Sequence, residues 1–301
     1  MTTKEYLESV LDAQTFADDD QEMKDLRKNR DEIKDCLLDA FGPPKPSIKW
    51  AGSMSKRTMI RDSYDGDVTC YFDHGDTQAG ETLKEIYAAV RDALREEYVV
   101  QEKKTALRVL SGQPGTRGEP MHVDVVPGRY VDDDKDDVFL HFNGADKERL
   151  KTNLDVHIAH VRDSGVRPAI RLVKLWKLQN GLTHAKTFVI ELLVIDLLKN
   201  RKSRSLEDQL LHVWTEFRDN ADTLTVKDPA NPDGNDLSGT LDACRNDLSR
   251  VAKRTLQTIE DDGWEAVFGP IEKKSAEAQR AAVKSTVSSV NTPNRPWLPR
   301  D

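Results

Sequence analysis

Two aspartates at the start of one apolar segment constrain this chain more than any other feature of its sequence. The segment DGDVTCYF, from Asp65 to Phe72, is typical of a strand, and its first and third residues are Asp65 and Asp67. Side chains alternate across a strand, so these two carboxylates are expected to share one face. They repel one another unless a positive charge lies between them, and a hard divalent cation is the simplest neutraliser. The alternative is an ordinary surface turn at SYDG.

A third carboxylate stands alone in a second apolar segment. Asp124 lies among valines in MHVDVVP, and a charge inside such a strand is costly unless it is paired or binds a metal. Before the first pair, the strand-like IKWA runs into Gly52 and Ser53 and then into a short helix. Glycine permits close backbone approach, and helix-start amides with a serine hydroxyl can bind phosphate. The three features together favour a phosphoryl-transfer site in which three carboxylates hold two Mg²⁺ ions.

The hydrophobic pattern divides the chain into a mixed first half and a helical second half. Helices are predicted over residues 18–41 and 80–98, and strands at SIKWAGS, DGDVTCYF, TALRVLSG and EPMHVDVVPGRY. Further helices are predicted over residues 147–163, 168–179, 186–200, 206–220 and 241–262. The acidic run 132–137 predicts a solvated loop, and roughly the last thirty residues predict a peripheral tail. This pattern indicates the α+β class.

Composition narrows the class of protein. The chain has 301 residues, 37% of them apolar, and a formal net charge of −8. One or two domains are expected, and the acidic balance speaks against a long nucleic acid held by phosphate contacts. The three cysteines lie far apart without C-x-x-C spacing, so we expect a reducing compartment and neither a disulfide framework nor a zinc site. No signal peptide or apolar run of about 18 residues is present, so we expect a cytoplasmic protein without a membrane association.

The sequence leaves open the functional role of a basic stripe and of one histidine. Arg171, Lys174 and Lys177 recur every three residues and form a basic stripe on an otherwise apolar predicted helix. A solvated face with extended lysines is the alternative to a phosphate contact. His122 is expected on the same strand face as Asp124, where we predict a supporting rather than a metal-binding role.

The order of these motifs resembles that of the DNA polymerase β-like nucleotidyltransferases, in which Gly-Ser, D-x-D and a later lone aspartate follow one another. AGSMSKRTMIRDSYDGDVTCYF, MHVDVVPGRY, RLVKLWKLQNG, KTFVIELLVIDLL and TVKDPANPDGNDLS are similar to successive landmarks of one branch. That branch includes the oligoadenylate synthases, cyclic GMP–AMP synthase and the bacterial CD-NTases of CBASS antiphage defence. The resemblance implies a nucleotidyltransferase core over residues 1–165, a helical lobe over 166–301, and an active site between them.

The resemblance also implies roles for individual residues. Asp65, Asp67 and Asp124 match the catalytic carboxylates of the family, which hold two Mg²⁺ ions, with Mn²⁺ as an alternative. The implied nucleotide-binding residues are Gly52, Ser53, Lys177 and Thr187. In the family a lysine on the triphosphate and a hydroxyl residue on phosphate stand at the last two positions. The chain departs from the family at Gly66, where a branched apolar residue is usual.

The function implied by the resemblance is synthesis of a cyclic di- or trinucleotide second messenger from ATP, GTP or other NTPs, with release of pyrophosphate, in antiphage defence signalling. The alternatives are a linear oligoadenylate synthase, a nucleotidyltransferase acting on an RNA, protein or small-molecule acceptor, and a catalytically silent nucleotide-binding protein. No long nucleic acid is required, and a regulatory protein partner is a further expectation. Base choice, linkage and product length are not determined by the sequence.

Overall fold

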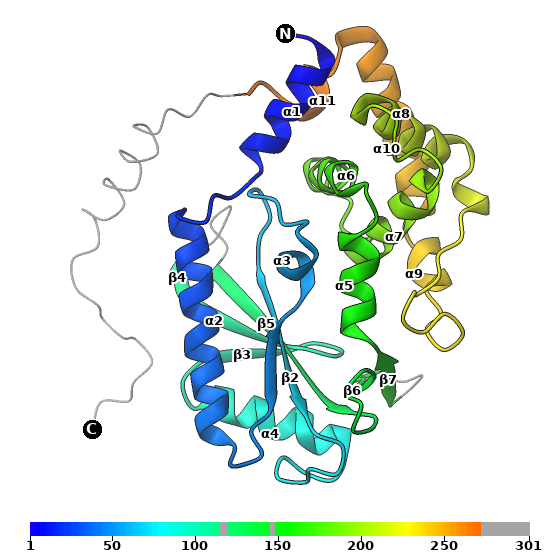
Figure 1. The fold of residues 1–301 in the computed structure, drawn as a ribbon. Coiled ribbons are helices and arrows are strands. Elements are labelled where there is room, and N and C mark those ends of the chain that lie inside the picture. The colour runs from blue at the N-terminus through cyan, green and yellow to red at the C-terminus, as the bar shows by residue number, and fades with distance from the viewer. Residues whose placement is uncertain (115–119, 145–147, 272–301) are drawn as a thin grey trace. The chain divides into compact units, whose positions relative to one another are not determined.

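The computed structural model describes residues 1–114, 120–144 and 148–271 (Figure 1). Residues 1–268 form one compact unit. No helix in the described part of the chain is both long and apolar enough to span a membrane. The predicted C-terminal tail lies outside the described residues from position 272 onward.

A mixed sheet of seven strands forms the first half of the molecule. In spatial order its main path is β1 (Ser47–Trp50), β2 (Gly66–Phe72), β5 (Pro120–Tyr130), β4 (Leu107–Pro114) and β3 (Val99–Glu102). On the far part of β5, β6 (Val138–His141) pairs with β5, and β7 (Arg149–Thr152) pairs with β6. Strands β2 and β5 run parallel, whereas the other described pairs are antiparallel.

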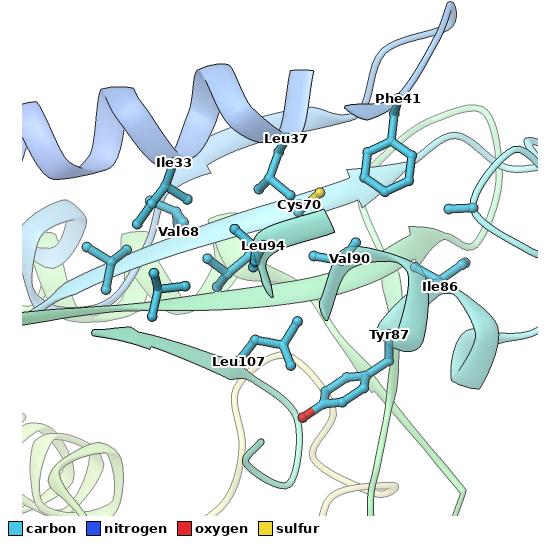
Figure 2. Close-up of a cluster of buried hydrophobic side chains, with 14 of the residues drawn as sticks. Ile33, Leu37, Phe41, Val68, Cys70, Ile86, Tyr87, Val90, Leu94 and Leu107 are labelled. Atoms are coloured by element: carbon cyan, nitrogen blue, oxygen red, sulfur yellow. The ribbon is translucent and has the colours of Figure 1, made fainter. Parts of the chain in front are cut away.

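Two long helices, α2 (Gln21–Ala40) and α4 (Leu83–Arg95), bury one face of the sheet. Helix α4 starts with a capping box between Thr82 and Glu85, which satisfies backbone donors at its first turn. Its side chains at four-residue spacing, among them Val90 and Leu94, point into the core. Figure 2 shows these side chains and Leu37 of α2 gathered against the strands. The core therefore fixes β2 and β5 from one side and leaves the other side for the site.

The second half is a helical lobe built around α6 (Arg167–Gln179). It contains α7 (Thr187–Leu198), α8 (Leu206–Asp219), α9 (Ser238–Asp242), α10 (Arg245–Asp262) and α11 (Glu265–Phe268), and α5 (Leu154–Arg162) leads into it from the sheet. Trp176 of α6 is fully buried, and its indole Nε1 donates a hydrogen bond to Thr255 Oγ1 at 2.7 Å. The first helix of the chain, α1 (Thr3–Ala13), contacts α6 and α8, so the N-terminus packs on the helical lobe.

The predicted α+β class is confirmed, and most predicted elements are present. The prediction of a helix over residues 147–163 was wrong at its start, because β7 occupies residues 149–152 and α5 begins only at Leu154. Asn153 marks the true start of α5, because its side chain accepts a hydrogen bond from the Val156 backbone at 3.0 Å. The helix predicted over 241–262 is divided into α9 and α10. The acidic run 132–137 is an exposed loop over most of its length, as predicted.

Three strands and two α-helices, α1 and α11, were not predicted. Strands β3, β6 and β7 have four residues each, and their pairing partners rather than an apolar pattern define them. Helix α1 did carry a sequence signal, since Thr2 and Glu5 form a capping box.

We expect Leu37→Ala to lower the free energy of unfolding by about 2–5 kcal/mol, because it removes a fully buried side chain between α2 and the sheet. Asp35→Ala, an exposed change on the same helix, is the control and should stay within about 0.5 kcal/mol of the wild type. Urea unfolding measures both. Equal effects of the two substitutions would contradict the assigned core.

Candidate active site

The three predicted carboxylates meet where β2 and β5 run side by side. In the parallel register, Asp67 of β2 is the direct neighbour of Asp124 on β5. Paired residues of adjacent strands project from the same face, so both carboxylates lie on one side of the sheet. Asp65 precedes β2 and lies close enough to influence the charge of Asp67. The structure therefore brings together three carboxylates from sequence positions almost sixty residues apart.

The Gly-Ser turn lies directly against this cluster. Strand β1 pairs with β2, and the Ala51 amide donates to the Asp67 carbonyl at 2.8 Å. Helix α3 (Gly52–Lys56) starts at the next residue, where Gly52 has φ +54°. A Cβ on Gly52 would lie 1.7 Å from Asp67 Oδ2. Only glycine accommodates both this close approach and this backbone conformation, and Ser53 follows it within α3.

A buried lysine of the helical lobe faces the carboxylates. Lys174 of α6 is almost fully buried, and its Nζ donates to the Thr58 carbonyl at 2.7 Å. Burial lowers the pKa of Lys174, while the charges of Glu191, Asp65 and Asp67 oppose this effect. Lys174 thus supplies positive charge beside the two aspartates of the D-x-D pair.

A second buried carboxylate, Glu191 of α7, connects α3 with the helical lobe. Glu191 is 2% exposed, and its Oε2 accepts a hydrogen bond from Lys56 Nζ at 2.8 Å. Its Oε1 accepts from Thr58 Oγ1 at 2.9 Å and lies 3.9 Å from Lys174 Nζ. Burial alone would raise the pKa of Glu191, but the two lysine charges and the hydrogen bonds hold it below its ordinary value. Glu191 is therefore a buried, charged carboxylate whose partners are Lys56, Thr58 and Lys174.

The crowded carboxylates have opposite pKa shifts. Burial, Asp65 and Asp124 together raise the pKa of Asp67 from 3.8 to about 7. Burial also acts to raise the pKa of Asp65, but His122 and the charges of Lys174 and Arg108 outweigh it, so the pKa is lowered. His122 Nε2 lies 3.5 Å from Asp65 Oδ2. The predicted supporting role of His122 agrees with this contact.

Asp124 is engaged by an arginine of the next strand. Arg108 of β4 donates from Nε to Asp124 Oδ1 at 2.8 Å and from Nη2 to Asp124 Oδ2 at 2.9 Å. Among the residues that the structure describes, no three His, Cys, Asp or Glu side chains are arranged as a metal centre. The carboxylates are gathered as predicted, but their oxygens do not converge on one point in this arrangement.

The two remaining predicted residues lie elsewhere in the helical lobe. Lys177 is half-buried, and burial together with the charge of Lys186 lowers its pKa, while Cys244 has a smaller opposing effect. Thr187 is the first residue of α7. Their roles at the triphosphate stay predictions. Within the basic stripe, the lysine whose charge reaches Asp65 and Asp67 is Lys174, one turn before Lys177, and Lys56 of α3 also acts on Asp67.

Sequence reasoning did not assign Lys56, Arg108 or Glu191. Two of them carry a recognisable signal, a charge flanked on both sides by apolar residues: Glu191 in TFVIELLVIDLL and Arg108 in ALRVLS. The argument that singled out Asp124 applies equally to both, because a buried charge needs a partner.

The sequence matches no protein-family model and no curated protein. Among solved structures, the chain is similar to the CdnC:HORMA-deltaN complex of Escherichia coli MS115-1, with a TM-score of 0.61, 19% identity and coverage of 89% of this chain and 97% of that chain. It is also similar to Elizabethkingia meningoseptica CdnE cyclic dinucleotide synthase with GTP and Apcpp, with a TM-score of 0.60, 15% identity and coverage of 86% and 99%.

A third similar structure is the Bradyrhizobium diazoefficiens CD-NTase CdnG in complex with GTP, with a TM-score of 0.60, 13% identity and coverage of 94% of this chain and 96% of that chain. The likeness extends over nearly the whole length of these proteins. The chain therefore has the fold of the CD-NTases, in which a mixed sheet with helices is followed by a helical half, as the fold class expected from the sequence has it.

We expect Glu191→Ala to lower the free energy of unfolding by about 3–5 kcal/mol, because Lys56 and Lys174 would remain buried without their carboxylate partner. Asp196→Ala on the same helix removes only an exposed pair with Lys199 and should cost less than about 1 kcal/mol. Denaturant unfolding at neutral pH distinguishes the two. A small effect at Glu191 would mean that the buried network contributes little to stability.

The raised pKa of Asp67 predicts a pH dependence that an uncharged isostere should abolish. Between about pH 4 and pH 7 the folded state keeps a proton that the unfolded state has lost, so the free energy of unfolding falls as pH rises. Asp67→Asn should match the wild type only below about pH 4, where Asp67 is protonated in both states, and should exceed its stability at pH 8. Urea unfolding in the presence of EDTA measures this. A variant that is less stable than the wild type at pH 8 would contradict the raised pKa.

Proposed function

We propose that this chain is a nucleotidyltransferase that joins NTPs into a cyclic di- or trinucleotide second messenger and releases pyrophosphate. The observation that carries the proposal is the cluster of Asp65, Asp67 and Asp124 against Gly52, on the fold of the CD-NTases. Similar structures include a cyclic dinucleotide synthase with GTP and Apcpp and a CD-NTase with GTP. The net charge of −8 suits small substrates better than a long nucleic acid.

The chemistry of the donor set fits a divalent cation. Asp67 and Asp124 share one face with Asp65 close by, and burial together with the charges of Asp65 and Asp124 raises the pKa of Asp67, as expected where buried carboxylates lack enough positive charge. Asp65, Asp67 and Asp124 would hold two Mg²⁺ ions, with Mn²⁺ as an alternative. Bound there, the ions would lower the pKa of the attacking hydroxyl and offset charge on the triphosphate.

The chain's own residues would bind and orient the two nucleotides. The backbone amides and hydroxyl at Gly52 and Ser53 would hold phosphate oxygens beside Asp67. Asp124 would accept the proton of a 2′- or 3′-hydroxyl as that oxygen attacks the α-phosphate of the second nucleotide. Lys174, together with Lys177 and Thr187, would stabilise negative charge as pyrophosphate leaves.

We propose a cytoplasmic role in antiphage defence signalling, in which the product acts as a second messenger. The CdnC structure that contains HORMA-deltaN supports the expectation of a regulatory protein partner. The domain division at residues 165 and 166 is proposed as the boundary between core and helical lobe, within the single compact unit that spans residues 1–268.

Three other functions fit the same fold and differ in their products. A linear oligoadenylate synthase leaves a terminal phosphate, and a transferase for an RNA or protein acceptor labels that acceptor. A catalytically silent nucleotide-binding protein releases no pyrophosphate. The deciding experiment incubates the purified protein with labelled NTPs and Mg²⁺, treats the mixture with phosphatase, and identifies the product by mass spectrometry. A cyclic product keeps its label, whereas complete conversion of the label to free phosphate would contradict cyclisation.

We expect Asp65→Asn combined with Asp67→Asn to abolish pyrophosphate release from NTPs, a loss of at least about a thousandfold, because the two proposed metal ligands are removed. Asp133→Asn, in the exposed acidic loop, is the matched control and should keep wild-type activity. A coupled pyrophosphate assay measures all three proteins. Full activity of the double variant would show that the site is assigned wrongly.

A further inference from the structure

Arg108 forms the most complete ion pair at the candidate site. It lies on β4 directly beside Asp124 of β5, since the two residues are register partners in the antiparallel pair. Its Nε and Nη2 donate to the two carboxylate oxygens of Asp124 at 2.8 and 2.9 Å. Parallel hydrogen bonds of this kind between arginine and a carboxylate are among the strongest pairs in proteins. Both oxygens of Asp124 therefore already have a cationic partner.

The order of the residues across the sheet determines how the Arg108–Asp124 pair would affect the binding of a metal ion. Asp67, Asp124 and Arg108 follow one another on β2, β5 and β4. A divalent cation held by Asp67 and Asp124 would approach Asp124 from the β2 side, while Arg108 holds it from the β4 side. Two cations would then compete for one carboxylate, because its charge is a single unit.

Arg108 can leave Asp124 without any change in the sheet. Its side chain is 28% exposed, and arginine is long enough to turn its head group into solvent while its stem stays in place. Lys174 lacks this freedom, because it is almost fully buried and donates to the Thr58 carbonyl. Lys174 and Arg108 thus differ: Lys174 is held in place, whereas the head group of Arg108 can move.

We propose that Arg108 is a positioning residue that holds Asp124 in a closed ion pair, and that a divalent metal ion must open this pair to bind. The inference rests on the proposed function, since it concerns the carboxylate that the proposed reaction uses. Arg108 then keeps the carboxylates neutralised when no metal ion is present and lowers the affinity for metal. Metal binding would be coupled to release of the guanidinium, which could then face the substrate phosphates.

A purely structural role for Arg108 predicts the opposite result. If the pair only holds Asp124 in its correct place, removal of the guanidinium disorders the carboxylate, and metal binding weakens or stays the same. If the pair competes with the metal, removal frees the carboxylate, and metal binds more tightly. The sign of the change in metal affinity therefore separates the two roles, and it does not depend on catalytic activity.

The experiment titrates Mn²⁺ alone, without nucleotide, and follows free Mn²⁺ by electron paramagnetic resonance. We expect Arg108→Gln to bind Mn²⁺ about tenfold more tightly than the wild type, because a bidentate charged pair no longer competes. Arg108→Lys keeps the charge but loses the two-point geometry, and it should tighten binding by about threefold. Arg95→Gln removes an arginine paired with Glu102 away from the site and should leave binding unchanged.

Equal or weaker Mn²⁺ binding by both Arg108 variants overturns the inference. Circular dichroism shows whether each variant is folded, and if Arg108→Gln is not, the Arg108→Lys result alone decides. Pyrophosphate release by the wild type is measured in parallel with NTPs and Mg²⁺. If the wild type releases pyrophosphate but the Arg108 variants do not bind Mn²⁺ more tightly, only the proposed role of Arg108 is overturned. If the wild type releases no pyrophosphate, the proposed function is overturned.

Discussion

The buried carboxylate of Glu191 connects the two halves of this molecule. It lies on α7 and accepts hydrogen bonds from Lys56 and Thr58, at the end of the short helix that carries the Gly-Ser turn. Lys174 joins the same group from α6 and points its charge toward the D-x-D pair. An isolated charge at this depth would be too costly to keep, so the network holds only when core and helical lobe are docked. The same contacts that close the interface also set the position of α3 beside β2.

The site itself is organised by an excess of negative charge. Asp67 and Asp124 are forced side by side by the parallel pairing of β2 and β5. The protein offsets this charge with three cations of different mobility: Lys174 is buried and fixed, His122 lies beside Asp65, and Arg108 is bound to Asp124 but partly exposed. The raised pKa of Asp67 indicates that these cations do not fully neutralise the cluster. A buried carboxylate cluster of this kind is stabilised by any further positive charge.

Much of the candidate site could be predicted from sequence because each signal was local. Strand alternation predicts that Asp65 and Asp67 share one face. Asp124 was singled out because a charge buried among valines is costly unless it has a partner. The need for glycine at position 52 was also anticipated, and the close approach to Asp67 explains it. The basic stripe contains Lys174, whose charge reaches Asp65 and Asp67, whereas the role of Lys177 at the triphosphate stays a prediction, because spacing along a helix does not tell which turn faces the other lobe. Short strands such as β7 were missed because pairing, not pattern, creates them.

From the sequence alone we could derive three carboxylates, a Gly-Ser turn, an α+β order of elements and an acidic net charge. Which of these groups meet depends on strand pairing and helix packing in the folded chain. The register of β5 between β2 and β4 sets Asp124 between Asp67 and Arg108, and the packing of α7 against α3 gives Glu191 its partners. Register and docking are fixed by contacts between residues far apart in the chain. A single sequence records the residues that make such contacts but not the pairing between them.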